Sequence, residues 1–568
     1  MFRVKSSAVS QGYDSIKIPC RNGLTFEEGN QINFDLTRDI GMANLKNACL
    51  EFDINLNGSA NAPLAQIVKS VGANALFNRV TIRSMGRVLE QLDNYNLYSN
   101  MVYLAGEDEG TINRRSINEG CAPSYKILDN PYVTQNESIA AGGTINNVAN
   151  SWRYKDLKVQ IPLLGGIFQN PQNHPLMAVP LEVEIILEKN NRVLYSDPVL
   201  QTDIPCEDFT AGAKTQLVLS DAYCRKLGII GTAQEYPDGD DNSRLNRVSN
   251  LPIRVGQRVL IAAGGGAGVI ENGGAHEVQS ITVNAPTGRI VLNFAGNIKT
   301  GGGTNTGVTC NLLNAGGLFT NTVGGVGPQS LSYQVKNPRL IVPKVIPSPE
   351  FTRAMSVAMA KGMYAMDILS YTDYMTNIVG TTTASSSLIP ADLSRVKSLL
   401  NVPVEQINLD LLNNTNALHG SYMGAQSYEY QINNQMRPSR LVDLSREAHL
   451  AFAIGDDNYV QAAKWCEGSA LGAVHCYEVE KALTDAGIEV KNLRFLSKTG
   501  DACSLKHEGN YLVGRTLGPM GMSENLMGIS SLLYLNYDGS NTNLKLVHNY
   551  AVHVRTIALT PAGIELRY

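Results

Sequence analysis

The sequence predicts a mainly β protein built of sandwiches with Greek-key or jelly-roll wiring. Three observations support this fold class. Apolar and polar residues alternate with a period of two in many short segments, the pattern of half-buried strands. Charged residues make up only 17% of the 568 residues, and turn formers are plentiful, with 52 glycines. The predicted strands are irregularly spaced and show no repeat of about 20–50 residues, which favours sandwiches over a propeller.

The alternation is clearest at Leu181–Glu188. Its apolar side chains, Leu181, Val183, Ile185 and Leu187, fall on one face and its glutamates on the other, as expected for a strand of an antiparallel sheet. Further strands are expected at Gln31–Leu36, Ala48–Leu56, Arg79–Arg83, Leu157–Pro162, Arg339–Val345, Met363–Ile378, Val404–Leu411, Ser427–Ile432, Ser531–Tyr537 and Leu544–Leu559.

Helices are fewer, and the clearest one joins two large β domains. Ser348 is expected as its N-cap, Pro349 as its first residue and Gly362 just beyond its end. A second helical region is expected as an excursion of the second domain, with helices at Tyr459–Cys466 and Glu478–Ala486. The predicted divisions are a first sandwich at 1–346, a linker helix at 347–362 and a second sandwich at 363–568, with the helical excursion at about 445–500.

The glycine-rich stretch VLIAAGGGAGVIENGG, Val259–Gly274, raises the question of a nucleotide-binding turn. A dinucleotide fingerprint needs G-x-G-x-x-G followed directly by a helix. Gly264 and Gly266 supply the first two positions, but the third falls on Val269, and a β-branched segment follows in place of a helix. We therefore interpret these glycines as a surface loop.

The segment after the glycines predicts a small inserted β module. Glu277–Val283 and Arg289–Phe294 read as the two strands of a hairpin. With a strand at Arg254–Leu260 and glycine-rich connections on both sides, they predict a barrel of about five or six strands inserted at 230–328.

The composition argues against several classes of protein. The formal net charge is −4 and the isoelectric point about 6.1, so no strong basic field attracts nucleic acid. The nine cysteines are an odd number without a C-x-x-C pair, which indicates reduced thiols rather than a disulfide framework or a zinc site. No signal peptide or membrane-length apolar run is visible, and we expect synthesis in the cytosol or nucleus.

Each catalytic motif in the sequence is incomplete. His507 and Glu508 begin an H-E-x-x-H pattern, but Tyr511 occupies the place of the second zinc ligand. Ser523 lies in a partial nucleophile elbow that lacks its final glycine. His548 and His553 are five residues apart on one strand and are expected on opposite faces. We therefore predict no catalytic, cofactor-binding or metal-binding residues, and no enzymatic activity.

Four segments, in this order and spacing, resemble the double jelly-roll major capsid proteins of icosahedral DNA viruses. They are VQIPLLGGIF at Val159–Phe168, PLEVEI at Pro180–Ile185, YQINNQMRPSR at Tyr430–Arg440 and the ending from Tyr550 to Tyr568. The family includes adenovirus hexon, tailless-phage capsid proteins and those of polinton-like and large eukaryotic DNA viruses. The resemblance covers both halves of the chain but not the predicted insertion.

The resemblance implies two jelly-roll sandwiches in tandem and a structural role. The protein is then a major capsid protein whose pseudo-hexameric homotrimers build an icosahedral shell, in contact with neighbouring capsomers and with penton and minor capsid or cement proteins. It implies no cofactor and no sequence-specific nucleic-acid binding, and it leaves an internal membrane and nuclear assembly open. The expected location is the virion, after synthesis in the host cytoplasm.

In that family the strands stand upright to the shell and long loops form outward towers. The insertion is therefore expected to be a tower that contacts neighbours, spikes or a host surface, and a deletion of 232–326 is expected to leave trimers intact. The alternative is a jelly-roll carbohydrate-binding or carbohydrate-active protein, which needs paired carboxylates or an aromatic platform in a groove. The chain has only two tryptophans, Trp152 and Trp465, and no convincing carboxylate pair.

Overall fold

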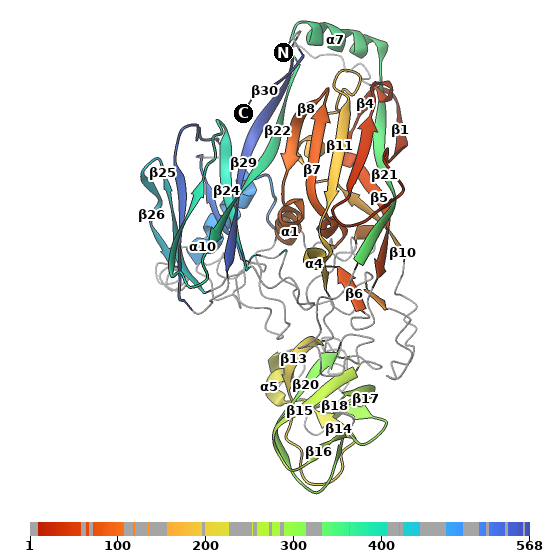
Figure 1. The fold of residues 1–568 in the computed structure, drawn as a ribbon, viewed down its shortest axis with the longest axis vertical. Helices are drawn as coiled ribbons and strands as arrows, with labels where there is room; N and C mark the ends of the chain where they lie inside the picture. The colour runs from red at the N-terminus through yellow and green to blue at the C-terminus, as the bar shows by residue number, and fades with distance from the viewer. Residues whose placement is uncertain are drawn as a thin grey trace, which may run out of the picture.

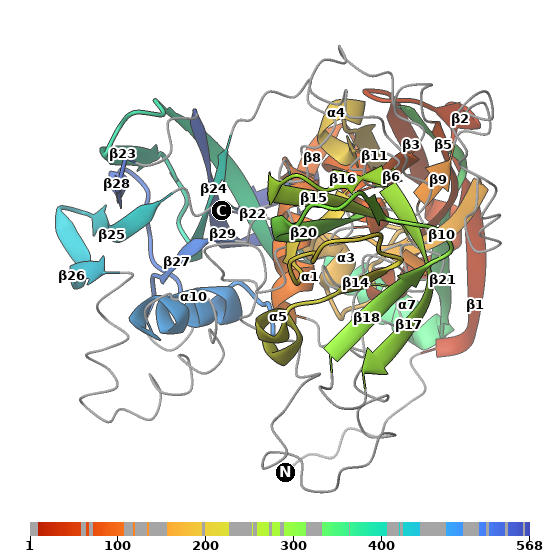
Figure 2. The ribbon, with the colours of Figure 1, turned by 90° about the horizontal axis from the view of Figure 1, so that it is seen from below.

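Two β-sandwiches stand side by side in the computed structural model, and a small β module lies beyond one end of the first sandwich (Figure 1). Seen from that end, the module lies in front of the first sandwich and leaves the second uncovered (Figure 2). The structure describes residues 10–57, 64–67, 72–106, 118–119, 133–135, 156–195, 199–226, 253, 258–271, 275–284, 289–313, 332–362, 364–405, 418, 420, 424–443, 473–491, 511–518, 522–539, 544–560 and 563–567.

The first sandwich consists of two antiparallel sheets. One has the strand order β1-β21-β5-β10 and the other the order β3-β11-β7-β8. The strands are β1 (Ser10–Pro19), β3 (Gln31–Leu36), β5 (Cys49–Asn57), β7 (Phe77–Ser84), β8 (Arg87–Leu92), β10 (Asp156–Pro162), β11 (Leu181–Leu187) and β21 (Ser332–Pro347), with the short strands β2 (Thr25–Phe26) and β4 (Met42–Ala43) paired to β21.

The second sandwich is built the same way. Its sheets have the orders β22-β29-β24-β27 and β23-β28-β25-β26, again antiparallel. The strands are β22 (Tyr364–Ile378), β23 (Ala384–Ile389), β24 (Val396–Glu405), β25 (Ala425–Ile432), β26 (Gln435–Asp443), β27 (Val513–Thr516), β28 (Ser531–Tyr537) and β29 (Lys545–Thr560), with β30 (Gly563–Arg567) paired to β29.

The two sandwiches share one wiring. When the main strands of each are numbered along the chain, both have one sheet in the order 1-8-3-6 and the other in the order 2-7-4-5. This is jelly-roll wiring, so the predicted fold class, two jelly rolls in tandem, is confirmed. We call them the first and second rolls. In each roll the last strand pairs with the first, so the beginning and the end of the chain segment that forms the roll lie close together.

Alternating side chains build the apolar core as the sequence predicts. Every second side chain is buried along β11 and along β28. One continuous core cluster includes Phe34 and Phe52 of the first roll together with Tyr428 and Leu533 of the second. Full burial of an aliphatic or aromatic side chain stabilises a fold by about 1.5–3 kcal/mol. The shared apolar core therefore stabilises the packing of the two rolls against each other.

The linker helix α7 (Pro349–Ala360) lies across the end of the first roll that is remote from the module (Figure 1). The Oγ atom of Ser348 accepts a hydrogen bond of 3.2 Å from the Phe351 amide, as expected of an N-cap. Met355 of α7 packs against Met42 and Val345. The helix thus carries the chain from β21 of the first roll to β22 of the second.

Each roll also has a helix after its fifth strand. These are α1 (Tyr95–Gly106) in the first roll and α10 (Ala473–Asp485) in the second, where α10 packs on β24 and β27. The predicted helix at Glu478–Ala486 coincides with the second half of α10, while Tyr459–Cys466 lies outside the described residues. Among the helices that the structure describes, none is long and apolar enough to cross a membrane.

The inserted module has a six-stranded sheet with the order β13-β20-β15-β17-β18-β14 and a core of its own, separate from the core of the rolls. The predicted hairpin is confirmed, since β17 and β18 pair antiparallel up to Asn284 and Arg289. The strands are β13 (Val199–Pro205), β14 (Gln216–Val218), β15 (Arg258–Gly266), β17 (Ala275–Asn284), β18 (Arg289–Phe294) and β20 (Asn305–Leu313), with helix α5 (Asp221–Lys226) after β14.

The sheet of the module begins earlier in the chain than the predicted insertion at 230–328. Its first strand, β13, precedes residue 230 and pairs with its last strand, β20. The apolar residues Ile204 and Leu217 of these early strands belong to the core of the module. Local alternation could not reveal this, because β13 finds its partner about a hundred residues further along the chain.

The interpretation of Gly264–Gly266 as a surface loop is wrong. These glycines form the end of β15 and pair with β20, where Gly266 lies opposite Asn305. Gly266 has a φ of 118°, and a Cβ atom there would lie 2.0 Å from the Thr304 carbonyl oxygen. Glycine is required because the two backbones approach closely, a function within a strand that composition alone does not distinguish from a flexible loop.

Candidate functional site

The joint between the two rolls is the site where side chains of chemical interest converge. Strand β8, at the edge of its sheet in the first roll, faces β22 and β29 of the second. Arg555 on β29 donates a hydrogen bond of 2.6 Å from Nη1 to the Leu89 carbonyl of β8, and Arg87 on β8 donates to the Ile564 carbonyl of β30. The second roll thereby occupies backbone acceptors along an edge that would otherwise invite further strands.

A buried carboxylate connects two strands of the second roll with a turn of the first at this joint. Oδ2 of Asp373 on β22 accepts hydrogen bonds from Nδ2 of Asn94 at 2.7 Å and from Nδ1 of His548 on β29 at 2.8 Å. Since a carboxylate oxygen accepts, Nδ1 of His548 carries the proton in this contact. The Asp373 and His548 side chains are fully buried, so protein hydrogen bonds rather than water satisfy Oδ2 of Asp373.

Three tyrosines pack beside this carboxylate. Tyr98 of α1 stacks on Tyr371 of β22 with ring centroids 3.9 Å apart, and Tyr550 of β29 meets Tyr371 edge-on at 5.3 Å. Burial raises the pKa of each phenol above its usual value, so all three stay un-ionised. Aromatic pairs of this kind contribute about 0.5–1.5 kcal/mol each beyond the burial of their area.

Glu90 on β8 is the second buried carboxyl of the joint. It is completely buried and accepts hydrogen bonds from the amides of Gly166 at 2.8 Å and Ile167 at 3.1 Å. Burial raises the pKa of Glu90, while the nearby Ser370 side chain, the two amides and the charge of Arg555 act in the opposite direction. The group therefore favours its neutral form more than an exposed glutamate does.

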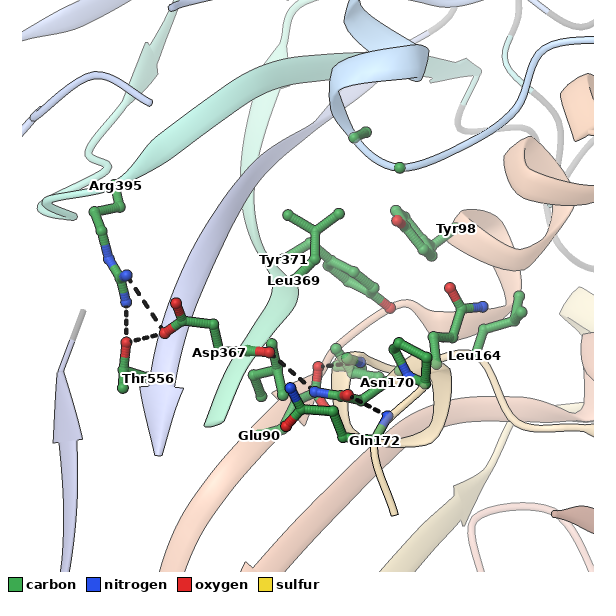
Figure 3. A pocket seen from close by; sticks show the side chains of 18 of the residues that line it. Glu90, Tyr98, Leu164, Asn170, Gln172, Asp367, Leu369, Tyr371, Arg395 and Thr556 are labelled. Carbon is green, nitrogen blue, oxygen red and sulfur yellow. Dashed lines mark hydrogen bonds and ion pairs between the residues drawn. The ribbon is translucent and has the colours of Figure 1, made fainter. Parts of the chain in front are cut away.

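A cavity of about 710 Å³ opens between the rolls beside these groups (Figure 3). Its walls come from β8, α1 and the segment after β10 in the first roll, and from β22, β29 and the end of α10 in the second. Arg395 and Asp367 line it as an ion pair, 3.5 Å apart. Nδ2 of Asn170 spans the joint to the Asp367 carbonyl at 2.9 Å.

The motifs considered in the sequence do not converge here. Ser523 is exposed in the segment between β27 and β28. His553 is buried with Nδ1 3.2 Å from the Ala551 carbonyl oxygen, and burial, followed by the charge of Arg555, lowers its pKa to about 4. Tyr511 is buried, whereas His507 and Glu508 lie outside the described residues, as do Trp152 and Trp465. Within the described residues, no group of three or more histidine, cysteine, aspartate or glutamate side chains could hold a metal ion.

Sequence reasoning did not identify the groups of the joint. Asp367, Leu369, Tyr371 and Asp373 stand at alternate positions of β22, so they share the face turned to the first roll. Polar residues recurring within one face of a long strand are the signal that could have marked a buried contact between domains. Asn94, which donates to Asp373 from the first roll, carries no such pattern.

No protein-family model matches the chain, and no curated protein matches its sequence. Solved structures resemble it at low sequence identity. The Faustovirus major capsid protein aligns with a TM-score of 0.48 and 8% identity, over 98% of this chain and 92% of that one. VP54 of PBCV-1, fitted into a reconstruction of the virophage Sputnik, aligns with a TM-score of 0.44 and 10% identity over 100% and 99%. The mavirus major capsid protein gives 0.36 and 8% over 100% and 92%.

Proposed function

We propose that the chain is the major capsid protein of an icosahedral DNA virus and forms pseudo-hexameric homotrimers. The observation that carries this proposal is the duplicated jelly roll, with the same strand order in both copies and the rolls side by side. Three such chains around a threefold axis would present six similar sandwiches. That outline is close to sixfold and suits a hexagonal array, and the ring closes through heterologous contacts.

The two ends of the molecule differ, as a shell with an inside and an outside requires. The module lies at one end, and α7 and β30 lie toward the other (Figure 1). In our proposal the module points outward as a tower that contacts neighbours, spikes or a host surface. The opposite end then faces the interior, next to minor capsid or cement proteins.

A stable trimer of this kind needs large interfaces. Obligate interfaces usually bury more than roughly 2,000 Å² in total. At about 25 cal/mol per Å² of apolar area, such burial exceeds the cost of association. Sheet edges in both rolls would gain backbone partners or cover in the trimer, which also protects them from random pairing. The proposed role is structural rather than catalytic, in the virion after synthesis in the host cytoplasm.

The mass of the purified protein in solution tests the proposal. Light scattering is expected to give a single species at three times 61.5 kDa, and electron microscopy is expected to show a compact trimer with a near-hexagonal outline. A monomer that binds or turns over glycans would instead support a jelly-roll carbohydrate protein. Co-expression with penton and minor capsid proteins of the same virus is then expected to yield closed shells.

A further inference from the structure

Corresponding edges of the two rolls are covered differently. The fourth and fifth strands of each roll form a hairpin, β7-β8 in the first roll and β25-β26 in the second, and the fifth strand lies at the edge of its sheet. Strand β8 packs against β22 of the second roll, and Arg87 of β8 donates a hydrogen bond to the Ile564 carbonyl of β30. Strand β26 touches helix α10, but no described strand pairs with its free edge. Within the described part of the chain, β8 thus has a whole roll against it and β26 has none.

Exposed methionines lie beside the free edge of β26. Met436 on β26 is 43% exposed, and Met522 and Met527, in the segment that connects β27 to β28, are 64% and 55% exposed. Large apolar side chains that gather on a surface mark a contact site, and the flexible methionine side chain adapts to the shape of a partner. This composition favours a protein partner for the edge.

The segment that carries two of the methionines is joined to the β25-β26 hairpin. The Asn433 amide, in the turn between β25 and β26, donates a hydrogen bond of 3.3 Å to the Ser530 carbonyl. Arg437 of β26 donates two hydrogen bonds to the Glu524 carboxylate, at 2.5 and 3.0 Å. The pair satisfies both charges within the chain, so burial of this corner in an interface would leave neither of them unpaired.

The opposite flank of the molecule ends in another free strand edge. Strand β1 is the outermost strand of its sheet in the first roll, on the side of the molecule away from β26 (Figure 2). It is the first main strand of its roll, as β22 is of the second. Since β8 packs against β22 within the chain, the equivalent contact from β26 would fall on β1 of a second copy. A contact between two different flanks is heterologous and can close as a ring.

We propose that the β26 edge, with Met436, Met522 and Met527, docks against β1 of the first roll in a second copy of the chain. The contact repeats between copies the packing of β8 against β22 within one chain. Each copy gives one β26 edge and receives another on its β1, so a closed trimer has three identical contacts. The inference rests on the proposed homotrimer and names the two surfaces that join in it.

The first test places charges on the β26 side of the contact. The double variant Met436→Asp, Met527→Asp is expected to stay folded, because both side chains are exposed in the single chain. It is expected to need at least about a hundredfold higher protein concentration than the wild type to form trimers, because the new carboxylates would be buried without a counter-charge. Light scattering measures the mass, and circular dichroism checks the fold. Leu388→Asp is the matched control, since Leu388 is 51% exposed on β23, the other edge strand of the same sheet; it is expected to stay trimeric.

The outcomes separate this inference from the homotrimer itself. A double variant that forms trimers as readily as the wild type would overturn the inference and leave the trimer standing. A wild-type chain that stays monomeric would overturn the homotrimer and the inference together. Equal loss of trimers in the Leu388→Asp variant would contradict a specific part for the β26 edge.

Photocrosslinking locates the contact directly and also decides the matter if the double variant does not fold. Trimers are assembled from isotope-labelled and unlabelled chains that carry p-benzoylphenylalanine in place of Met436. After irradiation, mass spectrometry is expected to find links between a labelled and an unlabelled chain, with the partner peptide drawn from β1. Links to β23, to the module or to β26 of another copy, in place of β1, would refute the proposed docking.

Discussion

Nδ1 of His548 lies 2.8 Å from Oδ2 of Asp373, with both side chains fully buried at the joint between the rolls. The same oxygen accepts the amide of Asn94 from the first roll at 2.7 Å. One carboxylate therefore holds two neighbouring strands of the second roll and a turn of the first. The joint depends on a polar contact that neither roll could make alone.

Asp373→Ala is expected to lower the free energy of unfolding by about 2–4 kcal/mol, because it leaves two buried donors without an acceptor. Urea unfolding followed by fluorescence measures the loss. Asp14→Ala is the matched control, since Asp14 is exposed and its side chain accepts a hydrogen bond from the adjacent Ser15 amide. Equal stability of the two variants would show that the contact at Asp373 contributes nothing.

Two buried histidines are expected to make the protein less stable in acid. Burial lowers the pKa of His174 and of His553 to about 4, below the value near 6.5 of an unfolded chain. Between about pH 6.5 and about pH 4 these histidines are protonated in the unfolded chain but not in the folded protein. The free energy of unfolding is therefore highest above about pH 6.5 and falls as the pH is lowered toward 4. Each histidine accounts for about 3 kcal/mol over this range.

The double variant His174→Gln, His553→Gln is expected to lose much of this pH dependence. The measurement is urea unfolding at intervals from pH 7 to pH 4, compared with the wild type. If the free energy of unfolding falls with pH equally steeply in the wild type and in the variant, these histidines titrate alike in the folded and unfolded states.

Glu90 is expected to make the protein less stable as the pH rises, which is the opposite of the effect of the two histidines. Burial raises its pKa, so its favourable contribution is present below the pKa of an unfolded glutamate and is lost as pH rises through the folded value. Glu90→Gln cannot ionise and is expected to gain stability relative to the wild type as pH rises from about 4.5. Thermal unfolding of both proteins across this range provides the comparison. A stability difference that does not vary with pH would contradict the expectation.

Gly266→Ala is expected to disrupt the inserted module and leave the rolls folded. Its Cβ atom would lie 2.0 Å from the Thr304 carbonyl oxygen at a φ of 118°, and backbone atoms cannot yield as a side chain can. Limited proteolysis is expected to cut the module while sparing the rolls. Gly302→Ala is the control, because a Cβ there meets nothing within 4 Å and its φ is not positive. Equal resistance of both variants would exclude a steric need for glycine.

Removal of the whole module is expected to leave the two rolls folded and associated. The module has a core separate from that of the rolls, and its sheet extends from β13 to β20. A deletion of 199–313 therefore removes a complete unit, whereas a deletion of 232–326 leaves β13 and β14 without partners. Light scattering and thermal unfolding of both deletions provide the test. Loss of trimers in the longer deletion would make the module part of the trimer core.

The local pattern of the sequence was enough to find many of the long strands and the linker helix. It missed β1, β8, β23, β26 and β27, and the strand expected at Val404–Leu411 overlaps only the end of β24. Alternation predicted β11 and β28 almost to the residue, and the Ser348 cap marked the start of α7. These features depend on neighbours a few residues apart, and side-chain direction within a strand follows directly from sequence position. The extent of the module could not be obtained this way, since β13 pairs with a strand far along the chain.

By itself, then, the sequence determined that this protein is a pair of β-sandwiches with an insertion, because burial of alternating apolar side chains is a local requirement. Only the tertiary structure decided that Glu90 and Ser370, or Asp373 and Asn94, share a buried joint. Such contacts join residues hundreds of positions apart, and their energy depends on burial that exists only once both rolls have folded. The use of glycine at Gly266 was likewise decided by the approach of a second strand, which no local composition records.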